Sequence, residues 1–217
     1  GGGSIPRPGE VSLAHHGVLF LDEMPEFSRD VLETLRQPLE DGYVTIARAQ
    51  GTVRFPAQFM LVAAINPSTD GYHNAGGLST VTRRKISGPI VDRIDVHVEV
   101  PEVPISDLIS TRTGTSSQHL KKKVQQAWVF QHKRQGQIRN GYLSGPQLDK
   151  MAVIDSDGQE LLHQSVTSLG LSARGYDKLR RLGRTIADME SSSVIRAHHI
   201  AEAVQYRLLD RGMAQVR

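Results

Sequence analysis

Two uninterrupted apolar runs, each closed by polar residues, constrain the fold of this chain most strongly. Residues 17–22 (GVLFLD) lead into Asp22 and Glu23, and residues 59–66 (FMLVAAIN) end at Asn66. Apolar runs of this length without polar alternation are typical of strands that are covered on both faces of a parallel sheet. We therefore expect two fully buried strands whose polar ends lie at the carboxyl edge of one sheet.

The segment between the two runs predicts a helical crossover and a hairpin. A helix is expected over about 29–41, with Ser28 as its cap, a bend or restart at Pro38 and a stop at Gly42. Apolar residues then alternate with others on both sides of a turn at Gln50-Gly51, which indicates a hairpin over 44–55. Two buried strands that are separated by a helical crossover indicate an α/β fold with a parallel sheet.

The remainder of the chain predicts one more strand and then helices only. Alternating apolar residues over 92–101 (DRIDVHVEVP) indicate a strand, and two prolines mark a boundary shortly after it. The helices expected beyond that boundary cover 117–135, 146–153, 157–169, 173–189 and, after Ser193 as its cap, 194–210. The chain thus divides into an α/β part, 1–103, and an all-helical part, 104–217.

The composition excludes several classes of protein. The 217 residues contain no cysteine, so disulfides and thiolate metal sites are ruled out. No apolar run approaches the roughly 20 residues of a membrane helix, and the opening GGGSIPRPGE is not a signal peptide. We expect a cytoplasmic protein without a membrane partner. The net charge of +3 permits a nucleic acid as partner without requiring one.

The polar residues at the strand ends are the first candidates for chemistry. Ligands of α/β proteins bind at the carboxyl ends of the strands, where Asp22, Glu23 and Asn66 are expected. A rigid strand followed by Asp-Glu suits phosphoryl transfer, because the Asp can hold the Mg²⁺ shell and the Glu can orient or deprotonate the attacking water. The alternatives are an acidic helix cap for the two carboxylates and a turn at Asn66-Pro67.

Three stretches carry a resemblance to a known family. They are residues 1–67, the segment ISGPIVDRIDVHVEVP at 86–101 and the segment LSARGYDKLRRLGRTIADME at 171–190. These stretches resemble the AAA+ module of the magnesium-chelatase-like proteins, those of the ComM type in particular. The resemblance implies a partial P-loop NTPase core, a parallel sheet with helices over 1–103, and an all-α lid within 104–217.

The resemblance implies roles for five residues around a site for ATP and Mg²⁺. Asp22 and Glu23 match the Walker B acids, with Asp22 reaching Mg²⁺ through water and Glu23 acting as the catalytic base. Asn66 matches sensor 1, Arg93 matches the arginine finger that enters a neighbouring subunit's ATP site, and Arg174 matches sensor 2 of the lid. Arg174 follows Ser172, a candidate N-cap, so it is expected in the first turn of a helix. The residues alone leave two alternatives open, a local surface ion pair for Arg93 and a solvated arginine on a basic helix for Arg174.

Two further segments match insertions of this clade. PGEVSLAHHG at 8–17 matches the helix-2 insertion, and 44–55 matches the pre-sensor hairpin. In related motors such insertions face the central pore, so Arg48 and Arg54 are candidate contacts for DNA phosphates. The alternative is that the two arginines are simply solvated, which is the more common state of arginines on a hairpin.

Two features depart from the family pattern. The chain contains no G-x-x-x-x-G-K-[ST] phosphate loop, which in the family precedes the segment that Gly1–Gly3 matches. We therefore expect the chain to be the C-terminal fragment of a longer protein, which alone binds ATP weakly or not at all and does not hydrolyse it. Residues 67–85 lack the cysteines that ComM-type proteins usually carry there, so no metal-binding role is carried over to them.

Three functions of different classes follow from these residues. The first is an ATP-driven motor subunit of a homo-oligomeric ring, a hexamer, that remodels DNA by branch migration in recombination and natural transformation. The alternatives are the motor of a magnesium chelatase, which drives magnesium into a porphyrin, and a non-catalytic AAA+ scaffold. The pairs His15-His16 and His198-His199 are expected to be structural, because adjacent histidines point in different directions and make poor paired metal ligands.

Overall fold

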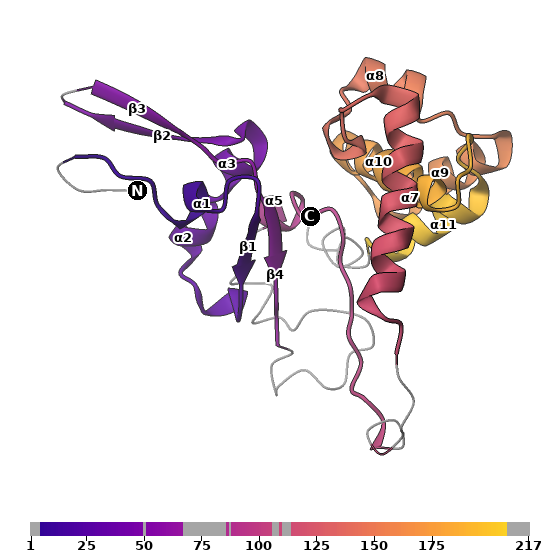
Figure 1. Cartoon of the computed structure of the whole chain (residues 1–217), viewed down its shortest axis with the longest axis horizontal. Coiled ribbons are helices and arrows are strands. Elements are labelled where there is room, and N and C mark those ends of the chain that lie inside the picture. Colours follow the sequence, from indigo (N-terminus) through magenta and orange to yellow (C-terminus); the bar gives the residue numbers. More distant parts are fainter. Residues whose placement is uncertain are drawn as a thin grey trace. The chain divides into compact units, whose positions relative to one another are not determined.

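The computed structural model describes residues 5–49, 51–66, 86, 88–105, 109 and 114–207. They belong to two compact units, Gly1–Ile94 and Asp95–Arg217 (Figure 1). All of the described strands lie in the first unit, and the second unit is built from helices. Among the described helices, none combines the length and the apolar character that a membrane span requires.

A small parallel sheet forms the centre of the first unit. β1 (Val18–Leu21) pairs with β4 (Met60–Ala63) in a parallel register that begins with Val18 opposite Met60 (Figure 1). A short helix, α1 (Glu10–Leu13), precedes β1. Both strands are those predicted from the apolar runs, and their parallel pairing is confirmed.

The expectation that both strands are buried on two faces is wrong. Every second side chain of the pair is exposed, namely Val18, Phe20, Met60 and Val62, and Phe20 reaches 58% exposure. Alternate side chains of a strand point to opposite faces, so these four share one face. The apolar run has the pattern of a doubly covered strand, but the described residues cover only the other face of the sheet.

Two short helices follow β1 and the one-turn helix η1 (Met24–Glu26). The Ser28 hydroxyl caps α2 (Arg29–Thr34), and α3 (Arg36–Asp41) begins after a one-residue break. Pro38 lies in the first turn of α3, where its missing N–H costs no helical hydrogen bond. Gly42 ends α3 with a left-handed φ of 72°. The predicted cap, restart and stop are therefore confirmed.

The predicted hairpin is also present. β2 (Tyr43–Arg48) pairs antiparallel with β3 (Gly51–Pro56), and Ala57 N donates to Gly42 O at the open end of the hairpin, away from the turn. The predicted turn at Gln50-Gly51 lies partly outside the described residues, because the structure describes Gly51 but not its neighbour. The cysteine-free segment 67–85 lies outside the described residues as a whole.

The predicted strand over 92–101 is wrong. After α5 (Gly88–Val91), no residue from 92 to 104 belongs to a strand. Val96, Val98 and Val100 alternate as predicted, but all three are exposed. Alternation makes one apolar face, and a strand also needs a neighbour for its backbone hydrogen bonds. None of the described strands pairs with this segment.

The second unit contains the five helices that the sequence predicts, with bounds that shift by a few residues. They are α7 (Ser117–Gln135), α8 (Gly145–Met151), α9 (Ser156–Leu169), α10 (Ala173–Met189) and α11 (Ala197–Gln205), with the one-turn helix η3 (Asn140–Tyr142) between the first two. The predicted cap of the last helix is wrong, because Arg196 and not Ser193 precedes α11. Ile195 pairs in an isolated parallel bridge with Ile154, so the chain is still extended there.

The core of the second unit lies around α10. Leu148, Leu162, Leu179 and Ile200 come from four different helices and are fully or almost fully buried. Burial of such side chains stabilises by about 1.5–3 kcal/mol each relative to exposure. This unit therefore holds a contiguous hydrophobic core of its own.

A buried ionic network joins α7 to α10 beside this core. Asp188 accepts ion-paired hydrogen bonds from Arg134 and Arg184, and Asn140 Nδ2 donates to Asp188 Oδ2 over 2.8 Å. Burial lowers the pKa of Arg184 from its ordinary value, and the carboxylate of Asp188 opposes that effect. The network satisfies charges that would otherwise be expensive to bury.

Candidate functional site

The carboxyl ends of β1 and β4 bring the predicted acids and the predicted amide together. Two backbone hydrogen bonds continue the pairing beyond the strands, from Ala64 N to Leu21 O (2.9 Å) and from Met24 N to Ala64 O (3.0 Å). Asn66 Nδ2 then lies 3.5 Å from Glu23 Oε1, a long hydrogen bond between residues 43 positions apart in sequence. The parallel register of the two strands is the cause of this proximity.

The backbone at Glu23 has an unusual conformation. Its φ of 49° and ψ of 45° are left-handed, although Glu23 is not a glycine. This conformation costs about 1–2 kcal/mol, and its N–H is held by Asp22 Oδ1 at 3.0 Å. The turn directs the chain into η1, whose Met24 is fully buried, and leaves both carboxylates exposed at the sheet edge. Strained residues of this kind cluster at functional sites.

The chemistry of this edge fits a magnesium ion. Asp22, Glu23 and Asn66 offer carboxylate and amide oxygens, which are the ligands that Mg²⁺ takes in proteins. All three side chains are exposed, so a phosphate-bound ion could reach them. The edge therefore has a donor set for an ion, but the sequence contains no phosphate-binding loop beside it.

Arg93 lies elsewhere in the first unit and is folded back on its own chain. Arg93 Nη1 donates to Pro89 O at 2.7 Å, and Arg93 Nη2 forms an ion pair with Glu40 on α3. Its side chain is only 10% exposed. The sequence alternative of a local ion pair thus has a counterpart in the structure, with Glu40 as the partner instead of the adjacent aspartates. Glu40 was not predicted, because 53 positions separate it from Arg93.

Arg174 belongs to the second unit. It follows Ser172, the N-cap of α10, whose hydroxyl accepts a hydrogen bond from Gly175 N at 3.2 Å. The predicted cap is confirmed, and Arg174 is exposed in the first turn of the helix as expected. The N-terminal turn of a helix favours anions, which suits the proposed role of an arginine that contacts phosphate.

The two hairpin arginines are both exposed. Arg54 on β3 places its guanidinium 3.6 Å from the ring centroid of Tyr43 on β2, a cation–π contact across the hairpin. Arg48 lies at the end of β2 opposite Gly51. Neither arginine forms an ion pair with any residue in the described part of the chain, so both can offer their charge to a partner.

The first histidine pair has a structural role. His15 Nδ1 accepts a hydrogen bond from Gln58 N at 3.0 Å, and His16 N donates to Gln58 O. The two rings lie against each other with centroids 3.8 Å apart. These bonds connect the segment before β1 to Gln58, two residues before β4, so the pair positions the strands and supports the structural expectation.

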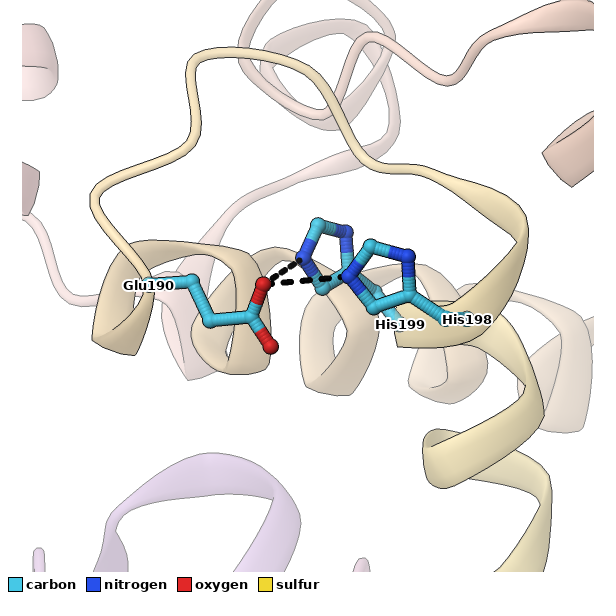
Figure 2. A group of neighbouring side chains, drawn as sticks. All are labelled: Glu190, His198 and His199. Carbon is cyan, nitrogen blue, oxygen red and sulfur yellow. Dashed lines mark hydrogen bonds and ion pairs between the residues drawn. The ribbon is translucent and has the colours of Figure 1, made fainter.

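The second histidine pair lies with Glu190 in a group that has the composition of a metal site. His198 Nε2 and His199 Nε2 both lie 3.0 Å from Glu190 Oε2 (Figure 2). His199 is fully buried, and its Nδ1 accepts the backbone N–H of Arg196 at 2.8 Å. The proton of a neutral His199 must therefore sit on Nε2, where it is donated to Glu190.

This hydrogen bonding argues against a metal ion at the group. A metal ligand needs a lone pair on Nε2, and His199 has none there while Nδ1 accepts from the backbone. The arrangement instead caps α11, since His199 reaches back to the residue before the helix. The hydrogen bonds from the two histidines hold the pKa of Glu190 below its usual range. Glu190 was not predicted, although a carboxylate shortly before a histidine pair in sequence is a usable signal.

Two family models match the chain almost end to end. Residues 1–108 match the family described as magnesium chelatase, subunit ChlI, and residues 114–207 match the family described as magnesium chelatase, subunit ChlI C-terminal. The break between the two matches, at residues 109–113, falls inside the second compact unit, which begins at Asp95.

The curated relatives agree with this assignment. Competence protein ComM of Haemophilus influenzae is 42% identical over 97% of this chain and 43% of its own length, and the uncharacterized protein YifB of Escherichia coli has the same values. The DNA replication licensing factor Mcm6 of Drosophila melanogaster is 23% identical over 98% of this chain and 27% of its own length. This chain therefore spans less than half of the length of these relatives. It belongs to the magnesium-chelatase-like family and is similar to members of the ComM type.

Proposed function

We propose that the whole protein is an AAA+ ATPase that couples ATP hydrolysis to the remodelling of DNA, including branch migration. The observation that carries this proposal is the group of Asp22, Glu23 and Asn66 at the carboxyl edge of the parallel sheet. The similarity to competence protein ComM supports DNA as the substrate. A DNA substrate also implies a cytoplasmic protein.

The proposed division of labour follows the two parts of the chain. Residues 1–103 act as the C-terminal portion of the AAA+ core, and 104–217 act as a linker and lid that carries Arg174. The bound nucleotide with its Mg²⁺ supplies the phosphoryl group that is transferred to water. Asp22 orients the water shell of the ion, Glu23 accepts a proton from the attacking water, and Asn66 positions that water.

Arg93 is the proposed arginine finger of a ring, most simply a homo-hexamer. A finger completes the site of a neighbour, so self-association is part of the mechanism. Because Arg93 is paired with Glu40 in its own chain, it must exchange that carboxylate for the phosphate of the neighbour's nucleotide. Arg48 and Arg54 on the hairpin are proposed contacts for DNA phosphates in the pore.

A second candidate is the motor of a magnesium chelatase. The description of both matching families favours it, since both are named for a magnesium chelatase subunit. It shares the proposed nucleotide site and differs in the substrate. A non-catalytic scaffold is a weaker candidate, because a scaffold does not require acids and amide together at the sheet edge.

The test measures ATP hydrolysis by the whole protein with and without branched DNA. The proposal expects turnover that branched DNA stimulates. Turnover that ignores DNA and instead needs a porphyrin and a chelatase partner would favour the second candidate, and no turnover under any condition would favour the scaffold.

The position of Arg93 is tested in mixed rings. Arg93→Ala subunits alone are expected to lose turnover, and so are Glu23→Gln subunits alone. A mixture of the two regains some activity, because an interface with Glu23 on one side and Arg93 on the other is intact. No recovery in any mixing ratio contradicts a role of Arg93 in a neighbour's site.

A further inference from the structure

The long helix α7 carries an unusual set of charges. Its 19 residues (SQHLKKKVQQAWVFQHKRQ) include neither Asp nor Glu. Its permanent cations are Lys121, Lys122, Lys123, Lys133 and Arg134. Arg134 is used inside the unit, where it pairs with Asp188. No residue in the described part of the chain forms an ion pair with the four lysines, so their charge is available to a partner.

The apolar residues of α7 are largely exposed. Leu120, Val124 and Trp128 recur every four residues, a spacing at which apolar side chains share one side of a helix and usually pack against a neighbour. In the structure all three are exposed, and Trp128 is 51% exposed. No residue of α7 is buried. The side chains of α7 that bond to the rest of the unit, Gln131 and Arg134, lie in its last two turns, whereas the three apolar residues precede them.

Hydrogen bonds identify the side that faces the unit. Gln131 Oε1 accepts from Asn140 N at 3.2 Å, and Arg134 bonds to Asn140 and Asp188. At 100° per residue, Lys121, Gln125, Trp128 and His132 form a stripe at spacings of four, three and four that is rotated by roughly 120° away from that side. We define the α7 outer face by Lys121, Lys122, Gln125, Trp128, Val129 and His132, all of which are exposed.

The outer face combines cations with a flat aromatic surface. Figure 1 shows the helix itself, α7, at the front of its unit. The rings of Trp128 and His132 stack with centroids 5.2 Å apart and planes inclined by only 10°. Lys121 precedes this ring pair by two turns on the same stripe. Basic side chains that follow a phosphate backbone, next to aromatic rings that stack on bases, are the usual elements of sites for single-stranded nucleic acid.

We propose that the α7 outer face binds single-stranded nucleic acid, with Lys121 and Lys122 at phosphates and Trp128 against a base. This inference rests on the proposed function in taking DNA as the substrate, and it adds a second contact surface outside the hairpin. Charge complementarity selects this occupant, because a helix with four unpaired lysines and no acid attracts a polyanion. The exposed ring of Trp128 favours unpaired bases, because the bases inside a duplex already stack on one another and cannot stack on this ring.

The experiment uses the chain of 217 residues and its own fluorescence. Trp128 is the single tryptophan of the chain, so its emission reports from the proposed surface directly. The chain is titrated with an oligothymidylate of about 16 nucleotides, a length within the range that single domains occupy. The expected result is quenching of the emission that weakens steeply as salt is raised.

Variants separate stacking from charge. Trp128→Ala is expected to weaken binding of a dye-labelled oligothymidylate, measured by anisotropy, by about fivefold or more, while Trp128→Phe retains most of it. Lys121→Gln with Lys122→Gln is expected to weaken binding severalfold and to reduce its salt dependence. Lys150→Gln on α8 is the matched control and leaves binding unchanged. Circular dichroism confirms that each variant is folded, as expected for exposed positions.

Three outcomes overturn the proposal. They are the absence of quenching, equal affinity in the double lysine variant and the parent chain, and quenching by polyglutamate as strong as that by the oligothymidylate. The last outcome would assign the face to an acidic protein surface. If the chain fails these tests while branched DNA stimulates the whole protein's ATPase, only this inference fails. If the chain passes while the ATPase ignores DNA, the proposed function fails and the binding surface remains.

Discussion

The two compact units differ in how far their central apolar side chains are exposed. Leu179, at the centre of α10, is fully buried, whereas Phe20, at the centre of β1, is 58% exposed. The second unit closes a contiguous core with its own helices, and the first leaves one face of its sheet without cover from any described residue. The difference indicates that the helical unit is stabilised by its own core, whereas one face of the sheet gains little from burial against the described residues.

The two units also differ in whether their charged side chains are buried or exposed. The helical unit buries ionised groups, and its network around Asp188 is almost inaccessible to water. The α/β unit exposes Asp22 and Glu23 at the end of β1, where the backbone of Glu23 is in a strained, left-handed conformation. Buried charges in the first case serve the fold, and exposed charges in the second case are available to a ligand.

The largest expected effect comes from breaking the buried network. Asp188→Ala leaves Arg184, which is wholly buried, without its carboxylate, and is expected to lower the free energy of unfolding by about 3–5 kcal/mol. Urea unfolding followed by helical circular dichroism measures this loss. Asp157→Ala, at an exposed position in the first turn of α9, is the control and costs less than about 1 kcal/mol.

The second prediction compares the two apolar centres directly. Leu179→Ala removes a fully buried side chain and is expected to cost about 2–5 kcal/mol. Phe20→Ala removes more atoms but from an exposed face, and is expected to cost less than about 1 kcal/mol. Urea unfolding and hydrogen exchange of the strand amides give the two values. Equal costs would mean that the two units do not differ in the way described.

The third prediction concerns the pair that holds Arg93. Glu40→Gln removes the charge opposite a guanidinium that is only 10% exposed. Because the Glu40 side chain is 44% exposed, solvent screens the pair, and the loss is expected to be about 1 kcal/mol. Thermal unfolding of the α/β unit measures it. Asp41→Asn, its neighbour at the end of α3, is the control and should cost nothing, since an acid is unfavourable at a helix C-terminus.

The smallest effect is a dependence on pH at Glu190. The histidine hydrogen bonds lower the pKa of Glu190 in the folded chain, so its carboxylate adds stability above the ordinary glutamate pKa. That stability is lost as the pH falls through the lower, folded value. Its size is below about 1 kcal/mol because half of the Glu190 side chain is exposed.

Glu190→Gln tests this dependence. The variant is expected to be less stable than the parent chain at neutral pH, and the difference should disappear toward strongly acidic pH. Urea midpoints measured across that range give the difference. A gap that stays constant at every pH would show that the carboxylate charge is not its source.

Elements with local signals could be predicted from the sequence. Ser28, Pro38, Gly42 and Ser172 each act on neighbouring residues, and their caps, restart and stop are present as predicted. The parallel strand pair could be predicted as well, because two apolar runs with polar ends carry the signal in themselves. The proximity of Glu23 and Asn66 follows from that pairing.

What could not be predicted depends on partners that are distant in sequence. The segment 92–101 has the alternation of a strand but no neighbouring strand among the described residues. The exposed face of β1 and the exposed Trp128 have apolar patterns without the expected cover. Glu40 beside Arg93 is a pairing across 53 positions, which no local pattern indicates. Periodicity describes what a segment can bury, and tertiary structure decides what it does bury.

The central claim is that Glu23 at the carboxyl edge of the sheet is the base of a nucleotide site. The most direct test compares ATP binding and ATP hydrolysis by the whole protein with and without Glu23→Gln. We predict that the variant binds ATP as the parent does and loses hydrolysis by about a hundredfold or more, because a carboxamide cannot accept the proton. Hydrolysis at a rate near that of the parent protein would contradict the claim.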